Sequence, residues 1–208
     1  MIDPRMPLAK TMPSPLIYIR HGETDWNKEG RLQGGQDIDI NQTGKTQAKR
    51  NGQHLAEFLK EIGKSADDFR FVASPLTRTR ETMEIVRTQL GLDPKAYQTD
   101  DRLKEITFGI LEGKTLPEVH EEFPNVLERR RQDKWGYVHP GGESYKMLSY
   151  RIAGWMADQR EPMIVVAHGA VMRVLRGLLC GYPAAEVPDL DTPQDQFLFW
   201  QSGKERWV

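Results

Sequence analysis

Short apolar runs alternate along the chain with longer segments in which apolar residues recur at three- and four-residue steps. The short runs are typical of buried strands, whereas the three- and four-residue steps are typical of helices with one buried face. The pattern predicts strands at residues 16–19, 71–73, 163–167 and 197–200. It predicts helices at residues 43–63, 76–90, 117–131, 144–160 and 170–179.

Polar residues and glycines place the ends of several predicted helices. Thr43 is expected to cap the first helix, because its hydroxyl can accept a hydrogen bond from a free N–H of the first turn. Gly63, Gly91 and Gly181 follow the last apolar positions of three helices, where glycine commonly ends a helix. The pattern at residues 97–103 is weaker and fits either a further strand or an extended edge.

The alternation of strands and helices predicts the fold class. It implies a mostly parallel sheet with helices on both faces, which is a three-layer α/β/α sandwich. The 208 residues suffice for a single domain with a sizeable core. We expect residues 1–14 to form a flexible arm and residues 112–142, where charge is dense, to form an excursion that shapes an entrance.

The charge balance excludes several kinds of partner. The formal net charge is -1 and the isoelectric point is about 6.5, so the sequence predicts neither a nucleic-acid footprint nor a membrane surface. No apolar run approaches the roughly 20 residues that span a bilayer. The proline-rich first fifteen residues lack the apolar core of a signal peptide, and we expect a cytoplasmic protein.

Two predicted strands end in the same way. The first is followed by Arg20, His21 and Gly22, and the strand at residues 163–167 is followed by His168 and Gly169. In parallel α/β sheets ligands bind outside the carboxyl ends of the strands, so the two histidines could face one site. Taken singly, each histidine could instead be a hydrogen-bonding residue at the rim of the core.

A third strand end carries arginines. Ser74 and Pro75 suit the start of a helix, which places Arg78 and Arg80 near its first turn. A cation there opposes the helix dipole, and an anionic ligand would remove the conflict. The alternative is a solvated helix face in which an arginine pairs with a neighbouring glutamate.

Glu105 is the candidate acid. It lies between Leu103 and Ile106 and precedes Phe108. A carboxyl group in apolar company needs a partner or has a raised pKa, and the protonated state suits a general acid. The alternative is a buried structural salt bridge.

Together these residues resemble the histidine phosphatase superfamily, also called phosphoglycerate mutase-like. The order and spacing match from about Leu16 to the final strand. The matching motifs are Arg20-His21-Gly22-Glu23-Thr24 with Asn27, Ser74-Pro75-Leu76 with Arg78, Leu103 with Glu105 and Gly109, and Ala167-His168-Gly169.

The resemblance implies a role for each matching residue. His21 would be the nucleophile that becomes a phosphohistidine, and Glu105 would protonate the leaving oxygen and then activate water. The residues that would bind the phosphate or line its pocket are Arg20, Asn27, Arg78, His168, Gln33 and Gly34. The chemistry is consistent, because arginine can bind two phosphate oxygens and histidine attacks only through an unprotonated nitrogen. We therefore expect a backbone carbonyl to hold the other nitrogen of His21.

The family contains both phosphatases and mutases. A mutase must enclose its intermediate, and mutases of this family have a proline run that is missing here. Gly141-Gly142-Glu143-Ser144 resembles the phosphatase members instead, so we expect a phosphomonoesterase for a small phosphorylated metabolite. A phosphoglycerate mutase-type phosphotransferase is the alternative. A non-catalytic phospho-ligand binding module is disfavoured because His21 and Glu105 are both present.

No cofactor or metal is expected, because arginines and histidines supply the positive charge. His54, His120 and His139 lie on segments predicted to be at the surface, and no close ligand cluster of the kind found in zinc hydrolases is apparent. Arg129, Arg130 and Arg131 either form one charged helix face or select a substrate with a second acid group. Residues 201–208 form either an edge strand in a homodimer interface or a free tail, and the sequence does not choose.

Overall fold

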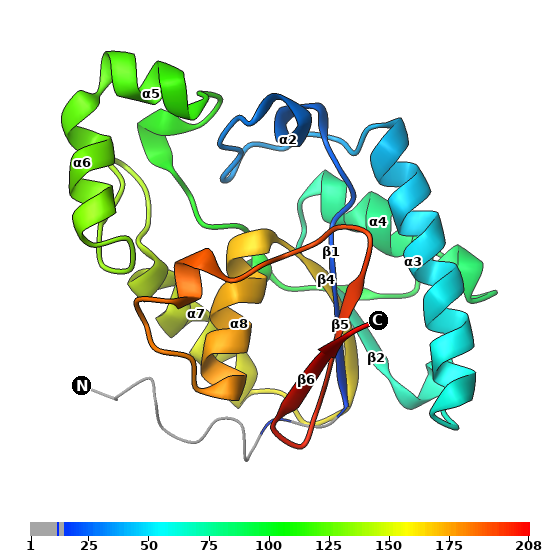
Figure 1. The fold of residues 1–208 in the computed structure, drawn as a ribbon. Helices are drawn as coiled ribbons and strands as arrows, with labels where there is room; N and C mark the ends of the chain where they lie inside the picture. The colour runs from blue at the N-terminus through cyan, green and yellow to red at the C-terminus, as the bar shows by residue number, and fades with distance from the viewer. Residues whose placement is uncertain (1–11, 13–14) are drawn as a thin grey trace.

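The sheet at the centre of the computed structural model has six strands within the residues that the structure describes, 12 and 15–208 (Figure 1). They are β1 (Leu16–Arg20), β2 (Arg70–Ala73), β3 (Gln98–Thr99), β4 (Met163–Ala167), β5 (Phe197–Gln201) and β6 (Lys204–Trp207). Their order across the sheet is β3-β2-β4-β1-β5-β6. The pairs β2–β3, β2–β4 and β1–β4 are parallel, and β1–β5 and β5–β6 are antiparallel. The mostly parallel sheet is confirmed.

Helices cover both faces of this sheet. In β1, Leu16 and Tyr18 pack into one core cluster with α7 (Tyr145–Ala157) and α8 (Gly169–Cys180). Ile17 and Ile19 pack into the other, with α3 (Gln42–Glu61) and α4 (Thr77–Gln89). Successive strand residues point to opposite faces, so a run that is apolar throughout belongs between two helical layers. The three-layer α/β/α sandwich predicted from the alternation is thus confirmed (Figure 1).

Two predicted helix boundaries are wrong. Asn41 rather than Thr43 caps α3, because the Asn41 side chain accepts a hydrogen bond from Gly44 N and the helix begins at Gln42. The single helix predicted at residues 117–131 is two helices, α5 (Leu116–Glu122) and α6 (Pro124–Gln132). Pro124 has no N–H to continue α5 and instead begins α6.

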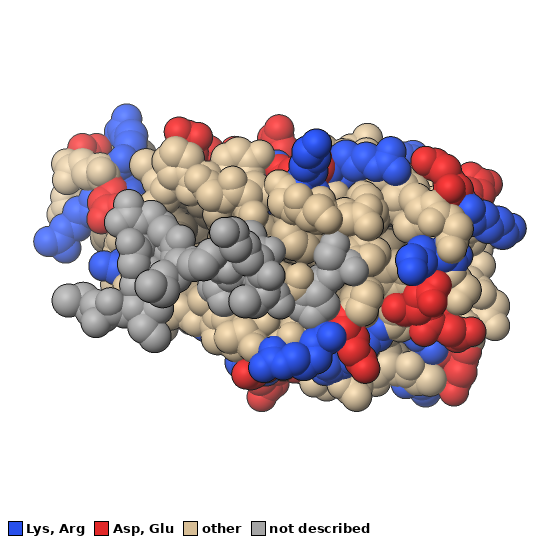
Figure 2. Space-filling model, turned by 90° about the horizontal axis from the view of Figure 1, so that it is seen from below, with Lys and Arg blue, Asp and Glu red and all other residues tan. Residues whose placement is uncertain are grey.

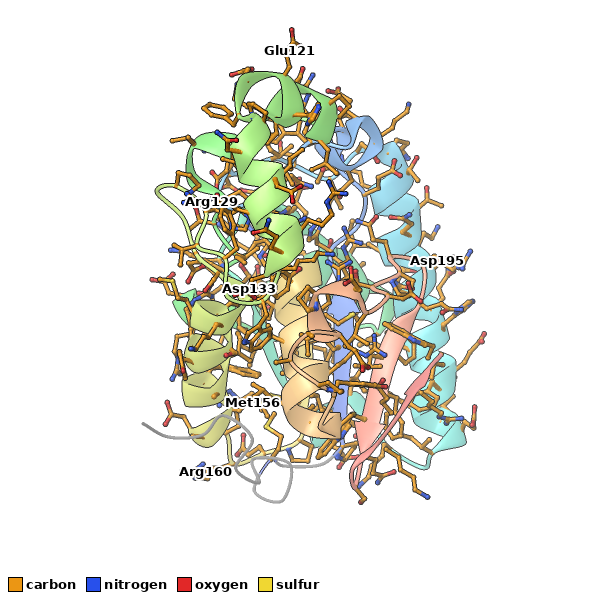
Figure 3. All side chains as sticks on the ribbon, turned by 60° about the vertical axis from the view of Figure 1, so that its left-hand side comes forward. Glu121, Arg129, Asp133, Met156, Arg160 and Asp195 are labelled. Carbon is orange, nitrogen blue, oxygen red and sulfur yellow. The ribbon has the colours of Figure 1, made fainter. Side chains whose placement is uncertain are left out.

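Helices α5 and α6 form a helical cap within the excursion predicted at residues 112–142. In Figure 1 they stand beyond the upper ends of α7 and α8, across a space from α2 (Asp25–Glu29). Glu121 lies at the outer tip of the cap, and Arg129 and Asp133 lie along α6 toward the body of the molecule (Figure 3). The excursion therefore stands over the end of the sheet to which the predicted site residues belong.

The remaining connections are short. Single turns of 3-10 helix occur at Ala66–Asp68, Asp101–Leu103, Gly109–Leu111 and Val187–Asp189. The weak signal at residues 97–103 corresponds to the two-residue strand β3 followed by one of these turns. The final residues form the edge strand β6 rather than a free tail. Most of the predicted N-terminal arm, residues 1–11 and 13–14, lies outside the described residues.

Charges of both signs are interspersed around the face of the molecule opposite the helical cap (Figure 2). Among residues 12 and 15–208, no helix is long and apolar enough to cross a membrane.

Candidate active site

The parallel pairing of β1 with β4 brings the two histidines together. Arg20 is in register with Ala167, and His21 N donates to Ala167 O at 3.0 Å. His21 follows the end of β1, and His168 follows the end of β4. Their ring centroids lie 5.3 Å apart at an interplanar angle of 62°. The prediction that two strand ends face one site is met by the fold itself.

One nitrogen of the His21 ring is held by its own backbone. Nδ1 lies 2.8 Å from Gly22 O, so Nδ1 carries the proton and donates it to this carbonyl, as the sequence led us to expect. The second nitrogen, Nε2, then has a free lone pair. Burial and the positive charges of Arg78 and Arg20 hold the pKa of His21 well below its usual value. The imidazole is therefore neutral near pH 7.

His168 is fixed from two sides. Its Nε2 lies 2.7 Å from Ser74 Oγ, and its carbonyl accepts a hydrogen bond from Tyr18 Oη at 2.8 Å. Burial, and then the charge of Arg78, hold the pKa of His168 well below its usual value. Its Nδ1 is buried and has no hydrogen-bond partner among the described residues. If Ser74 donates to Nε2, Nδ1 carries a proton available to a ligand.

Two arginines flank the histidines. Arg20 Nη1 donates to Thr192 O at 2.8 Å. Arg78 is fully buried and donates from Nη1 to Gln36 O at 2.6 Å and from Nη2 to Gly34 O at 2.9 Å. The Nε–H of each guanidinium is buried without a partner among the described residues. Buried donors are normally paired, so ligand oxygens are the natural acceptors for these two groups.

Glu105 approaches the same place from the segment between the 3-10 turns Asp101–Leu103 and Gly109–Leu111. Its Oε2 accepts a hydrogen bond from Ala170 N in the first turn of α8 at 3.3 Å, and its Oε1 accepts one from Ile106 N at 3.0 Å. Within the described part of the chain Glu105 forms no salt bridge, so the structural ion pair weighed as an alternative is not found. Its charge nevertheless acts on both Arg20 and Arg78, which places it close to them.

The other predicted residues lie around this centre. Asn27 Oδ1 accepts hydrogen bonds from Thr24 N and from Gln194 Nε2, each at 3.2 Å, which fixes the amide. Gly34 contributes the carbonyl that holds Arg78. The Gln33 side chain is buried, but within the described residues its Oε1 has no partner. The role of Gln33 in the site remains a prediction.

A model of the histidine phosphatase superfamily (branch 1) matches residues 16–205. The chain belongs to this superfamily. The bifunctional 6-phosphofructo-2-kinase/fructose-2,6-bisphosphatase of Arabidopsis thaliana is 32% identical over 92% of this chain, which spans 24% of that protein. An uncharacterized phosphatase of Bacillus subtilis (strain 168), PhoE, is 33% identical over 77% of this chain and 74% of its own length.

Solved structures of histidine phosphatases have the same fold. A mycobacterial glucosyl-3-phosphoglycerate phosphatase in complex with VO3 superimposes with a TM-score of 0.72 at 26% identity, over 93% of this chain and 96% of that chain. The α-ribazole phosphatase of Shigella flexneri superimposes with a TM-score of 0.74 at 23% identity, over 89% of each chain. The names of three of these proteins specify phosphatases of small phosphorylated metabolites: fructose-2,6-bisphosphatase, glucosyl-3-phosphoglycerate phosphatase and α-ribazole phosphatase.

Several residues of this histidine phosphatase site were not foreseen. Thr192 holds Arg20, and Gln194 Nε2 donates to His21 O at 2.9 Å. They lie in an irregular segment before β5, where no periodic pattern marks them. Arg173 in α8 donates from Nη1 to Tyr145 Oη at 3.4 Å, and its charge acts on Arg20. Arg78 was identified as a cation in the first turns of a helix that follows a strand end. The same argument applies to Arg173.

One prediction about the remaining histidines is wrong. His54 and His120 are exposed, but His139 is 2% exposed. Its Nδ1 lies 2.7 Å from Glu143 O, and its ring contacts Phe108 and Tyr137 edge to face. The surrounding segment is charged, and a single buried side chain within it leaves no periodic signal.

Across the described residues no group of His, Cys, Asp and Glu side chains could hold a metal ion.

Proposed function

We propose that the protein is a phosphomonoesterase that hydrolyses a small phosphorylated metabolite through a phosphohistidine at His21. One observation carries the proposal: the Nδ1–H of a buried, neutral His21 is bound to Gly22 O within the positive field of the buried Arg78 and the half-buried Arg20. This arrangement aims a free lone pair on Nε2 at the space into which Arg20 and Arg78 direct their unpaired N–H groups.

In the first step, Nε2 of His21 attacks phosphorus and the ester P–O bond breaks. The Nη and Nε groups of Arg20 and Arg78 would bind the equatorial oxygens, where negative charge is spread in the transition state. His168 would donate from its remaining ring nitrogen, and Asn27 would line the pocket. Protonated Glu105 would give its proton to the leaving oxygen.

In the second step, water attacks the phosphohistidine and the P–N bond breaks. Glu105, now a carboxylate, would take a proton from the water, which restores its protonated form and releases phosphate. Its hydrogen bond from Ala170 N holds the carboxylate at the first turn of α8, two residues after His168. Residues of the chain supply every charge that the scheme needs, so chelators should leave turnover unchanged.

The substrate that we propose carries a second acidic group. Arg173 Nη1 donates to Tyr145 Oη at 3.4 Å, and the charges of Arg173, Glu105 and Arg130 all act on the Tyr145 hydroxyl. Arg130 also lines a cavity of about 850 Å³ between the helical cap and residues 184–189, together with Lys134 and Trp135. The names of the similar phosphatases specify such substrates, a sugar bisphosphate and a sugar phosphoglycerate.

For the arginine run at residues 129–131, the sequence left two alternatives, a charged helix face and selection of a substrate with a second acid group. The individual arginines differ in which alternative they fit. Arg131 pairs with Glu128 at 3.1 Å and is 82% exposed, as expected for a charged helix face. Arg130 and Arg131 both line the cavity, but of the three arginines it is Arg130 whose charge acts on Tyr145. We therefore assign substrate selection to Arg130 and Arg173 rather than to the run as a whole.

The covalent step is tested by rapid mixing with a ³²P-labelled phosphate ester and quenching in alkaline denaturant, in which phosphohistidine survives. Label on the wild-type protein that is lost in acid, and no label on His21→Ala, is the expected result. Equal labelling of both proteins, or no label on either, would contradict the proposal. A panel of sugar bisphosphates, phosphoglycerates, nucleotides and phospho-amino acids then identifies the substrate.

Mutase activity is distinguished from phosphatase activity on the same preparation. Phosphate release and interconversion of 2- and 3-phosphoglycerate are measured with and without 2,3-bisphosphoglycerate. Rapid interconversion with little free phosphate would favour the mutase.

A cytoplasmic location and a homodimer also remain proposals; the exposed edge strand β6 supports the dimer, which light scattering can test.

A further inference from the structure

Glu112 joins two segments that contribute to the candidate site, the loop after α2 and the segment that carries Glu105. Its carboxylate accepts hydrogen bonds from Gly35 N at 2.9 Å and from Gln36 Nε2 at 2.9 Å, in the loop after α2. The same carboxylate accepts hydrogen bonds from Thr107 Oγ1 at 2.8 Å and Phe108 N at 3.0 Å, in the segment that carries Glu105. None of these contacts belongs to the proposed chemistry.

On the loop side, a single peptide group links Glu112 to Arg78. The N–H of Gly35 donates to Glu112 Oε1, and the carbonyl of the same peptide, Gly34 O, accepts from Arg78 Nη2 at 2.9 Å. The peptide dipole lies between an anion and a cation, which stabilises its orientation. Gly34 has a φ of 54°, and a Cβ there would overlap the Glu112 carboxylate. The loop conformation and Glu112 therefore depend on each other.

On the acid side, Glu112 holds the backbone two and three residues after Glu105. The opposite side of this segment is held by Arg151, which donates to Lys104 O at 2.8 Å, and by Glu143, which accepts from Thr107 N at 3.3 Å. Arg151 and Glu143 are themselves an ion pair at 2.8 Å. The Glu105 segment is thus fixed from both sides, but only the Glu112 contacts run toward the Arg78 loop.

The carboxylate of Glu112 is suited to this position. Burial alone would raise the pKa of Glu112, but the hydrogen bonds from Gly35, Gln36, Thr107 and Phe108 hold it below its usual value. The group is therefore charged near pH 7, and its four donors are all satisfied by one side chain.

We propose that Glu112 is a positioning residue that sets the distance between the phosphate-binding Arg78 and the acid Glu105. The inference rests on the proposed function, in which these two residues act on the same phosphate ester. A side chain with no part in the proposed chemistry would then control both phosphate binding and protonation of the leaving group.

The decisive variant is Glu112→Ala, assayed on aryl phosphates whose leaving groups differ in pKa. We expect kcat to fall by roughly 10- to 100-fold for poor leaving groups and much less for activated ones, because a displaced Glu105 protonates less effectively. We also expect weaker binding of inorganic phosphate, measured by calorimetry, because Arg78 loses its support. Unchanged leaving-group dependence together with unchanged phosphate affinity would overturn the inference.

Two further variants separate positioning from a loss of folded protein. Glu112→Gln keeps an oxygen for Gly35, Thr107 and Phe108, so it should restore most of the activity; a glutamine variant as impaired as the alanine variant would contradict positioning. Glu118→Ala is the matched control, because Glu118 pairs with Arg31 at 3.0 Å and accepts from Thr115 N at 2.7 Å, whereas its hydrogen bonds and ion pairs within the described chain include neither residues 34–36 nor the residues around Glu105. It should leave the leaving-group dependence unchanged.

Failure of the proposed function is recognised separately. If the wild-type protein forms no phosphohistidine, the function fails, while the comparison of phosphate affinity between wild type and Glu112→Ala still tests the link to Arg78. If the wild type is labelled and Glu112→Ala matches it in every assay, only the positioning role fails.

Discussion

The rings of His21 and His168 meet edge to face with centroids 5.3 Å apart. Both rings are buried, and both lie in the positive field of Arg20 and Arg78. Two imidazolium ions could not share this place, since each would face like charges without water to screen them. The pair therefore stays neutral, which leaves one ring free to act as a nucleophile and the other to act as a hydrogen-bond donor.

The first prediction concerns the titration of these rings. In an NMR titration, neither His21 nor His168 should protonate around pH 6.5, the ordinary value for histidine. In Arg78→Met the pKa of both rings should rise, because a neighbouring positive charge is removed. Wild-type titration of His21 near 6.5 would contradict the neutral pair.

The same pKa values predict how stability depends on pH. The unfolded chain binds protons at these histidines as the pH falls below about 6.5, while the folded protein does not. The unfolded state then binds more protons, so the free energy of unfolding should decrease as the pH falls below that value. Urea denaturation at several pH values measures this slope. A His21→Asn, His168→Asn double variant should show a smaller slope, and an unchanged one would argue against the assignment.

Glu105→Gln should separate substrates by leaving group. An amide cannot donate the proton that a sugar oxygen needs, so turnover of poor leaving groups should be lost. Activated aryl phosphates, which need less protonation, should retain part of their turnover. Steady-state kinetics on the two substrate types provide the measurement. An equal loss on both would mean that Glu105 does not act as the acid.

Gly44 and Gly154 should respond in opposite directions to alanine. A Cβ on Gly44 would overlap the backbone of Glu23, because the start of α3 packs directly on the segment after His21. We expect Gly44→Ala to lose about 1–3 kcal/mol of stability. Gly154 is exposed on α7 with nothing near its would-be Cβ, so Gly154→Ala should gain about 0.5–1 kcal/mol. Chemical denaturation of both variants tests the pair.

The ion pair of Arg176 with Glu205 should matter more than those at the surface. Their nitrogen and oxygen lie 2.6 Å apart with side-chain exposures of 8% and 14%. Glu205→Gln leaves a buried guanidinium without its partner, and we expect a loss of about 3 kcal/mol. Glu61→Gln, whose partner Arg206 is 53% exposed, is the control and should change stability by less than about 1 kcal/mol. Equal effects would indicate that burial is not the cause.

Acid should weaken the same pair. Burial alone would raise the pKa of Glu205, but hydrogen bonds from Arg176 and Tyr182 hold it below its usual value. A carboxyl group with a lowered folded pKa contributes stability above its unfolded value of about 4.3, and the contribution is lost as the pH falls through the folded value. The difference in unfolding free energy between wild type and Glu205→Gln should therefore shrink in acid.

Most of the fold and the centre of the site were accessible from the sequence. The strands β1 and β4 follow from local patterns, and each predicted core strand ends within one residue of its predicted end. His21 and His168 were identifiable because each follows a strand directly, and Arg78 because it lies in the first turn of the helix after a third strand. The carboxyl ends of these parallel strands share one edge of the sheet.

The supporting contacts were not accessible in this way. Thr192 and Arg20 are 172 residues apart in the chain, and Glu112 and Gly35 are 77 apart. Such hydrogen bonds depend on how irregular segments pack, and no periodicity records them. The same holds for the burial of His139 within a charged excursion.

The sequence by itself thus determined the layers, the order of the elements and the reactive side chains, because strand and helix periods and residues at strand ends are local properties. Tertiary structure alone decided the neutral state of the two histidines and the peptide that joins Glu112 to Arg78. The physical reason is that burial, charge and hydrogen-bond geometry depend on groups that meet only after the chain has folded.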